Sequence, residues 1–154
     1  MKHRWAALVF VLALSVFMPR DADAQQAADT GQAGSGRRPG MKLGQNFPNP
    51  FNPETRIPFS IGNTPDCADS GRQYRVSLRV YNVLAQLVAV PLLQGGSTTV
   101  AGRPIENLML SCGDYTAYWD GKYLNSSREV ASGIYLYRLE VDGRAVVKKM
   151  IVMK

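Results

Sequence analysis

Acidic residues that lie near one another are the first candidates for chemistry in this chain. Asp66 and Asp69 flank Cys67, and Asp114 and Asp120 flank a segment of alternating polarity. Two carboxylates at a suitable separation can act as general acid and general base. Neither pair carries a further signature of catalysis, so the favoured interpretation is that these acids keep loops soluble. We predict no catalytic residues.

Histidine and metal-ligand chemistry is largely excluded by composition. The only histidine is His3, which lies in the N-terminal segment discussed below. Without another histidine there is no imidazole base for a serine or cysteine nucleophile and no His-based zinc motif. The chain also lacks an Asp-x-Asp-x-Asp-Gly run of the kind that binds calcium. We therefore expect no metal, no cofactor and no enzymatic activity.

The two cysteines, Cys67 and Cys112, are predicted to form a disulfide. An even cysteine count in an exported chain favours this interpretation. Closing the loop between them would contribute roughly 4 kcal/mol on the chain-entropy model. A pair of reactive thiols is the alternative, but no cluster of cations lies nearby in the sequence to lower a thiol pKa.

The N-terminus has the pattern of a secretory signal peptide. Lys2 and Arg4 precede an apolar run over residues 5–18, and Ala22-Asp23-Ala24 offers a cleavage site with small residues. Residues 1–24 are therefore predicted to be removed during export. Residues 25–42 are rich in Gly, Gln, Ala and Arg, and we expect a flexible linker. The formal net charge of +6 is spread along the chain, and no nucleic-acid partner is predicted.

From Leu43 onward the hydrophobic period is two, which is typical of strands. The clearest predicted strands are residues 57–61, 76–80, 115–119, 134–141 and 144–153, with another over 86–92 and a short one over 107–110. Pro58 suggests that residues 57–61 form an edge strand. Asp142-Gly143 is a strong signal for a two-residue hairpin turn. About seven short strands predict an antiparallel β-sandwich of immunoglobulin-like or fibronectin III-like type over residues 43–154.

Aromatic residues indicate the expected core, and prolines indicate the form of the segment that leads into the domain. Trp119 is the predicted buried tryptophan, and Tyr135 and Tyr137 share a strand face with Leu139 and Val141, as core residues would. Residues 46–53 contain three prolines, so we expect a stiff, extended segment there, anchored by its two phenylalanines, Phe47 and Phe51.

Five motifs then carry a family resemblance. They are QNFPNPFNPET at residues 45–55, LRVYNVL at 78–84, YWDG at 118–121, VASGIYLYRL at 130–139 and KKMIVMK at 148–154. In this order and spacing they resemble the type A C-terminal sorting domain of the type IX (Por) secretion system, which is related to the Ig-like domain of the flagellar hook-capping protein. The resemblance spans residues 43–154.

The resemblance implies an exported, non-catalytic module. It implies passage through the Sec machinery to the periplasm, recognition by the type IX outer-membrane translocon, and delivery to the outer cell surface or the medium. The residues implied in sorting are Pro48, Asn49 and Pro50, the strand start Gly133-Ile134-Tyr135, and the lysines Lys148, Lys149 and Lys154. For each of these residues, maintenance of the fold is the competing role.

Two departures from the family pattern bear on function. The family commonly has glycine where this chain has Ala85, so the turn there is expected to differ. The predicted mature chain also holds no separate cargo domain, which favours a free-standing extracellular module. Two alternatives stay open: a carbohydrate-binding or adhesion module that uses Tyr118, Tyr123 and Asp120, or a subunit that self-assembles through a free strand edge.

Overall fold

The computed structural model describes residues 40–154 except 65–66, 69–70, 96–99 and 125. The predicted signal peptide, residues 1–24, and residues 25–39 of the predicted linker lie outside the described residues. The last two residues of that predicted linker, 41 and 42, already belong to the first strand, which begins at Met41.

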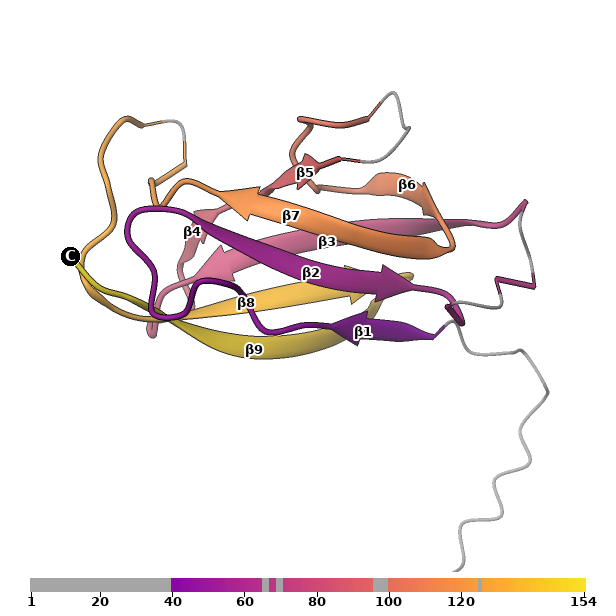
Figure 1. Cartoon of the computed structure of the whole chain (residues 1–154), viewed down its shortest axis with the longest axis horizontal. Coiled ribbons are helices and arrows are strands. Elements are labelled where there is room, and N and C mark those ends of the chain that lie inside the picture. The colour runs from indigo at the N-terminus through magenta and orange to yellow at the C-terminus, as the bar shows by residue number, and fades with distance from the viewer. Residues whose placement is uncertain (1–39, 65–66, 69–70, 96–99, 125) are drawn as a thin grey trace, which may run out of the picture. The chain divides into compact units, whose positions relative to one another are not determined.

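The described residues form nine strands (Figure 1). In chain order these are β1 (Met41–Leu43), β2 (Thr55–Ile61), β3 (Gln73–Tyr81), β4 (Leu87–Ala89), β5 (Leu92–Gln94), β6 (Leu108–Ser111), β7 (Gly113–Trp119), β8 (Gly133–Val141) and β9 (Arg144–Val152). Within this part of the chain no helix is long and apolar enough to cross a membrane.

Two antiparallel sheets pack face to face, which confirms the predicted β-sandwich. One sheet has the order β1-β2-β7-β5, and the other has the order β4-β3-β8-β9 with β6 also paired to β3. The count exceeds the expected seven strands because β1 was not predicted and one predicted strand is divided in two. The edges formed by β1 and β9 are in contact, so the sandwich is closed on that side (Figure 1).

Alternation in the sequence accounts for the core between the sheets. In β2 the residues Ile57, Phe59 and Ile61 are buried, and the intervening side chains are exposed or half-buried. Trp119 is buried, and its ring packs near Phe51 and Tyr135, with centroid distances of 5.5 and 5.9 Å. The four residues of β8 that were predicted as core, Tyr135, Tyr137, Leu139 and Val141, are all buried.

The prediction of a single strand over residues 86–92 is wrong. The chain leaves one sheet after β4 and enters the other at β5, with Val90 and Pro91 in the crossing. Pro91 has no N–H to continue a ladder, and its carbonyl accepts a hydrogen bond from Ile105 N at 2.9 Å. The apolar run is continuous because both strands contribute to the same core from opposite sheets.

The proline-rich segment is a compact loop rather than an extended lead-in. It must reverse the chain because β1 and β2 are antiparallel neighbours. It contains cis peptide bonds before Pro48, Pro50 and Pro53. Phe51 is buried as predicted, but Phe47 is 75% exposed, so the prediction of two aromatic anchors is half wrong.

The expectation that Pro58 marks an edge strand is also wrong, because β2 lies between β1 and β7. Pro58 falls just beyond the last β1 pair, Leu43 with Phe59, and its carbonyl accepts from Gly44 N at 2.8 Å. A residue with an N–H at position 58 would direct it to the same side as this carbonyl, toward Gly44. Proline has no N–H to donate there, and Gly44 O accepts a hydrogen bond from the hydroxyl of Tyr137 at 2.8 Å. Burial raises the pKa of this tyrosine, which keeps the hydroxyl protonated.

Two turns have the left-handed backbone that favours glycine, one as the sequence predicts and one at a position where a different turn was expected. Asp142 and Gly143 both have positive φ, at 48° and 80°, as a two-residue turn between β8 and β9 requires. At the β3–β4 turn, Ala85 adopts φ 59°, so the left-handed backbone that favours glycine is present despite the alanine. The expected departure at this turn is therefore not observed.

Cys67 and Cys112 form the predicted disulfide, with a Cα–Cα distance of 5.6 Å. The bond joins the connection between β2 and β3 to the junction of β6 and β7. It therefore ties together two connections that each run from one sheet to the other.

Candidate functional site

The proline loop and the C-terminal strand lie against each other, although they are far apart in the sequence. Asn49 Oδ1 accepts a hydrogen bond from Ile151 N at 2.9 Å. Phe51 N donates to Ile151 O, and Met153 N donates to Phe51 O, each at 3.0 Å. Phe51 thus pairs in parallel with Val152 as an isolated bridge. The loop covers the outer edge of β9 along its last residues.

The start of β8 borders the same region from the other side. Gly133 pairs with Val152 and Ile134 with Ile151. Lys154 N donates to Ser132 Oγ at 3.1 Å, and its ammonium group lies 2.9 Å from Glu129 Oε2. We use the name terminal surface for the exposed residues that these contacts bring together: Pro48, Asn49, Pro50, Gly133, Ile134, Lys149, Ile151 and Lys154.

Two of the predicted sorting residues lie outside the terminal surface. Tyr135 is buried, its ring lies beside Trp119, and its hydroxyl donates to Ala131 O at 3.0 Å. Lys148 is half-buried and pairs with Tyr137, farther from the chain end. Tyr135 therefore serves the core, and Lys148 lies on the face of β9 that carries its buried residues.

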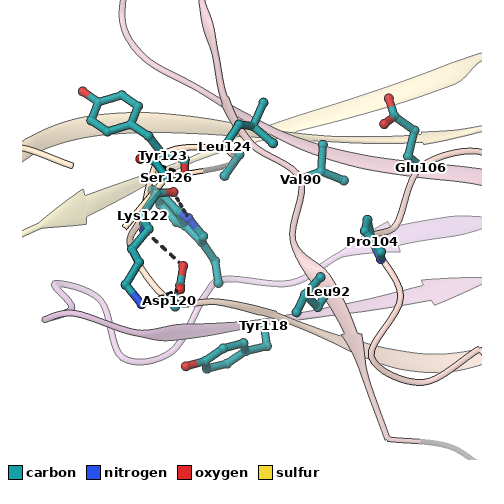
Figure 2. A pocket seen from close by; sticks show the side chains of 12 residues that line it. Val90, Leu92, Pro104, Glu106, Tyr118, Asp120, Lys122, Tyr123, Leu124 and Ser126 are labelled. Atoms are coloured by element: carbon teal, nitrogen blue, oxygen red, sulfur yellow. Dashed lines mark hydrogen bonds and ion pairs between the residues drawn. The ribbon is translucent and has the colours of Figure 1, made fainter. Parts of the chain in front are cut away.

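A second candidate site is a groove of about 480 Å³ where the chain crosses between the sheets (Figure 2). We call it the crossing groove and define it by Val90, Leu92, Pro104, Tyr118, Asp120, Lys122, Tyr123 and Leu124. It contains Tyr118, Tyr123 and Asp120, the three residues that were predicted from the sequence as candidates for carbohydrate binding. Figure 2 shows the two tyrosines at opposite rims, with Asp120 and Lys122 between them.

Hydrogen bonds fix the polar groups of the crossing groove. Asp120 accepts from Lys122 N at 3.1 Å, and its second oxygen lies 3.0 Å from Lys122 Nζ. The Tyr118 hydroxyl donates to Glu54 Oε2 at 2.7 Å, and this bond raises the pKa of Tyr118. The Arg128 guanidinium lies 4.9 Å from the centroid of the Tyr123 ring. These side chains are therefore held in place without a ligand.

Leu92 lines the crossing groove, and Glu54 and Arg128 contact its two tyrosines, but the sequence alone did not indicate these three residues. Leu92 is in β5, on the far side of the sheet crossing, and Glu54 directly precedes β2. The placement of Leu92 and Glu54 beside Tyr118 depends on strand pairing, since Leu92 is the register partner of Tyr118 and Glu54 accepts a hydrogen bond from the Tyr118 hydroxyl. The Arg128–Tyr123 contact is local, within the loop that follows β7, so the short spacing of a cation and an aromatic residue in the sequence is its signal.

The acidic pairs do not form a carboxylate dyad in the described residues. Asp114 and Asp120 lie at opposite ends of β7, and a strand of this length separates them by roughly 20 Å. Asp66 and Asp69 lie outside the described residues. Within the described part of the chain, no group of three or more His, Cys, Asp or Glu side chains is placed to hold a metal ion.

Comparison with known proteins shows no family for this chain. No protein-family model matches it. No curated protein matches it either. Among solved structures, it is similar to the Pseudomonas fluorescens alkylpurine DNA glycosylase AlkC bound to DNA containing an abasic site analog, with 11% identity and a TM-score of 0.41. The match covers 74% of this chain and only 30% of that chain.

Proposed function

We propose that this chain is a non-catalytic exported module of the type IX sorting class, whose terminal surface is read by the outer-membrane translocon. In this proposal the Sec machinery delivers it to the periplasm, and the translocon delivers it to the outer cell surface or the medium. The disulfide supports an oxidising compartment. The five sequence motifs support the assignment to this class of module.

The convergence at the terminal surface is the observation that carries the proposal. The motifs at residues 130–139 and 148–154 belong to the β8–β9 hairpin, and the motif at 45–55, distant in the sequence, meets them in one exposed region through backbone pairing. A partner that binds there contacts three of the five motifs at once. Exposed Lys149 gives the region a positive charge that an acidic partner surface can recognise, and Lys154 can contribute where such a partner competes with Glu129 for its ammonium group.

Lysine substitution is a sharper test than deletion of the C-terminus. Residues 148–154 include Met150 and Val152, which are buried in the core, so removing the segment would unfold the domain. The variant Lys149→Gln/Lys154→Gln removes the two lysine charges of the terminal surface and keeps the core. A matched control, Arg56→Gln/Arg103→Gln, removes two exposed cations elsewhere.

The test is secretion of the full chain in a bacterium that has the type IX translocon. The lysine variant is expected to accumulate in the periplasm with unchanged thermal stability, because exposed charges contribute little to folding. The arginine control is expected to reach the medium or the cell surface like the wild type. Secretion of the lysine variant at the wild-type level would contradict the sorting role.

A further inference from the structure

The crossing groove forms where the chain passes from β4 in one sheet to β5 in the other, next to the loop that follows β7. After β4 the chain departs through Val90 and Pro91, which leaves the flank of β4 without a strand. The loop after β7 covers this flank, with Leu124 N donating to Val88 O at 2.8 Å. The groove lies between this loop, β5 and the end of β7 (Figure 2). Its volume falls in the range typical of small-ligand sites.

Charges in the crossing groove are already balanced. Asp120 and Lys122 neutralise each other at 3.0 Å. Glu106, at the groove margin, is paired with Arg79 at 3.2 Å. An anionic or cationic ligand would have to compete with these pairs for its counter-charge. An uncharged ligand with many hydroxyls can instead donate to the Asp120 carboxylate and accept from the Lys122 ammonium without separating them.

The apolar part of the groove suits the carbon face of a sugar ring. Tyr118 is held at one rim by its bond to Glu54, so its ring is oriented before a ligand arrives. Leu92 is its neighbour in the adjacent strand, and Pro104 lies beyond (Figure 2). A sugar presents C–H groups on its faces and hydroxyls at its edges, which matches a tyrosine wall beside a carboxylate and an ammonium group.

We propose that the crossing groove binds an uncharged oligosaccharide, with Tyr118 as the stacking platform and Asp120 and Lys122 as hydroxyl partners. This binding uses no residue of the terminal surface. It therefore adds an extracellular binding activity to the exported module, and either proposal can fail without the other.

Trp119 provides a direct readout of the binding. Its indole Nε1–H donates to Lys122 O at 3.0 Å, so a ligand on Lys122 should move the indole NMR signal. We would titrate the full chain with maltotetraose, cellotetraose and tri-N-acetylchitotriose as neutral probes, and with trigalacturonate as the anionic probe. At least one neutral probe is expected to shift the signal at about 10 mM, and trigalacturonate is expected to bind more weakly.

Matched variants separate stacking from general structure. Tyr118→Ala is expected to weaken binding by about tenfold, and Tyr118→Phe, which keeps the ring, by about twofold or less. Tyr81→Ala removes another partly exposed tyrosine, outside the groove, and is expected to bind like the wild type. The backbone NMR spectrum of each variant reports whether it is folded.

The proposal is overturned if none of the three neutral probes shifts the indole signal. It is also overturned if Tyr118→Ala binds as tightly as Tyr118→Phe, or if trigalacturonate binds more tightly than every neutral probe. The lysine variant designed for the secretion test is expected to keep full saccharide binding, which distinguishes this site from the terminal surface.

Discussion

Ala85 shows how one residue can be held in an unfavourable conformation by its neighbours. Its φ of 59° lies in the left-handed region, where an L-residue with a Cβ is disfavoured by about 1 kcal/mol. The turn is held by Asn82, whose side-chain oxygen accepts from Leu84 N at 3.0 Å and from Gln86 N at 2.9 Å. These bonds and the pairing of β3 with β4 maintain the turn against the local preference of alanine.

Ala85→Gly is therefore expected to stabilise the domain, by about 0.5 kcal/mol, since relief of the strain exceeds the added entropy of the unfolded chain. Urea unfolding measures this change. The control is Ala145→Gly in β9, where no positive φ is present, and there glycine is expected to cost roughly 0.5–1 kcal/mol. Equal destabilisation by both substitutions would contradict the strain argument.

At the scale of elements, predictions succeeded where side-chain alternation alone decides the structure. Strands β2, β3, β7, β8 and β9 were all predicted, because each has one face in the core and a period of two. The sheet crossing at Val90 and Pro91 was missed because both flanking strands bury apolar residues, so the hydrophobic run has no break. The three-residue strand β1 is too short to produce a pattern.

The two candidate sites differ in how far they could be predicted. Tyr118, Asp120 and Tyr123 are close in the sequence, so their proximity in the crossing groove follows from one strand and its turn. The terminal surface depends on contacts such as Asn49 with Ile151, which are separated by 102 residues. Such a contact follows from the topology of both sheets, which no local pattern specifies.

Gly121 fixes the start of the loop after β7, which forms one wall of the crossing groove. Its φ is +72°, and a Cβ there would collide with the carbonyl oxygen of Pro53. Gly121→Ala is therefore expected to cost about 1 kcal/mol for the backbone and a further 1–3 kcal/mol for the clash. Thermal or urea unfolding measures the sum.

Gly102 supplies the matched control for Gly121. Its φ is similar, at +79°, but nothing lies within 4 Å of an added Cβ. Gly102→Ala should therefore lose only the backbone part, about 1 kcal/mol. If Gly121→Ala lowers the free energy of unfolding no more than Gly102→Ala does, the clash argument is contradicted. The backbone at Pro53 would then move aside for the added Cβ at little cost.

At the scale of the whole molecule, the disulfide is expected to supply much of the stability. The cysteines are separated by 45 residues, and a loop of this length corresponds to about 4 kcal/mol on the chain-entropy model. Cys67→Ser/Cys112→Ser should lower the free energy of unfolding by about this amount, measured in urea. Wild-type protein in reducing agent is the control and should behave like the double variant. Unchanged stability in both would contradict the prediction.

The bridge between Phe51 and Val152 has a consequence for the order in which the domain can assemble. The loop between the first two strands is completed by backbone groups of Ile151 and Met153, at the end of the last strand. A polypeptide that is synthesised with its N-terminus first must therefore wait for these residues before this end of the sandwich can close. Long-range closure of this kind slows folding.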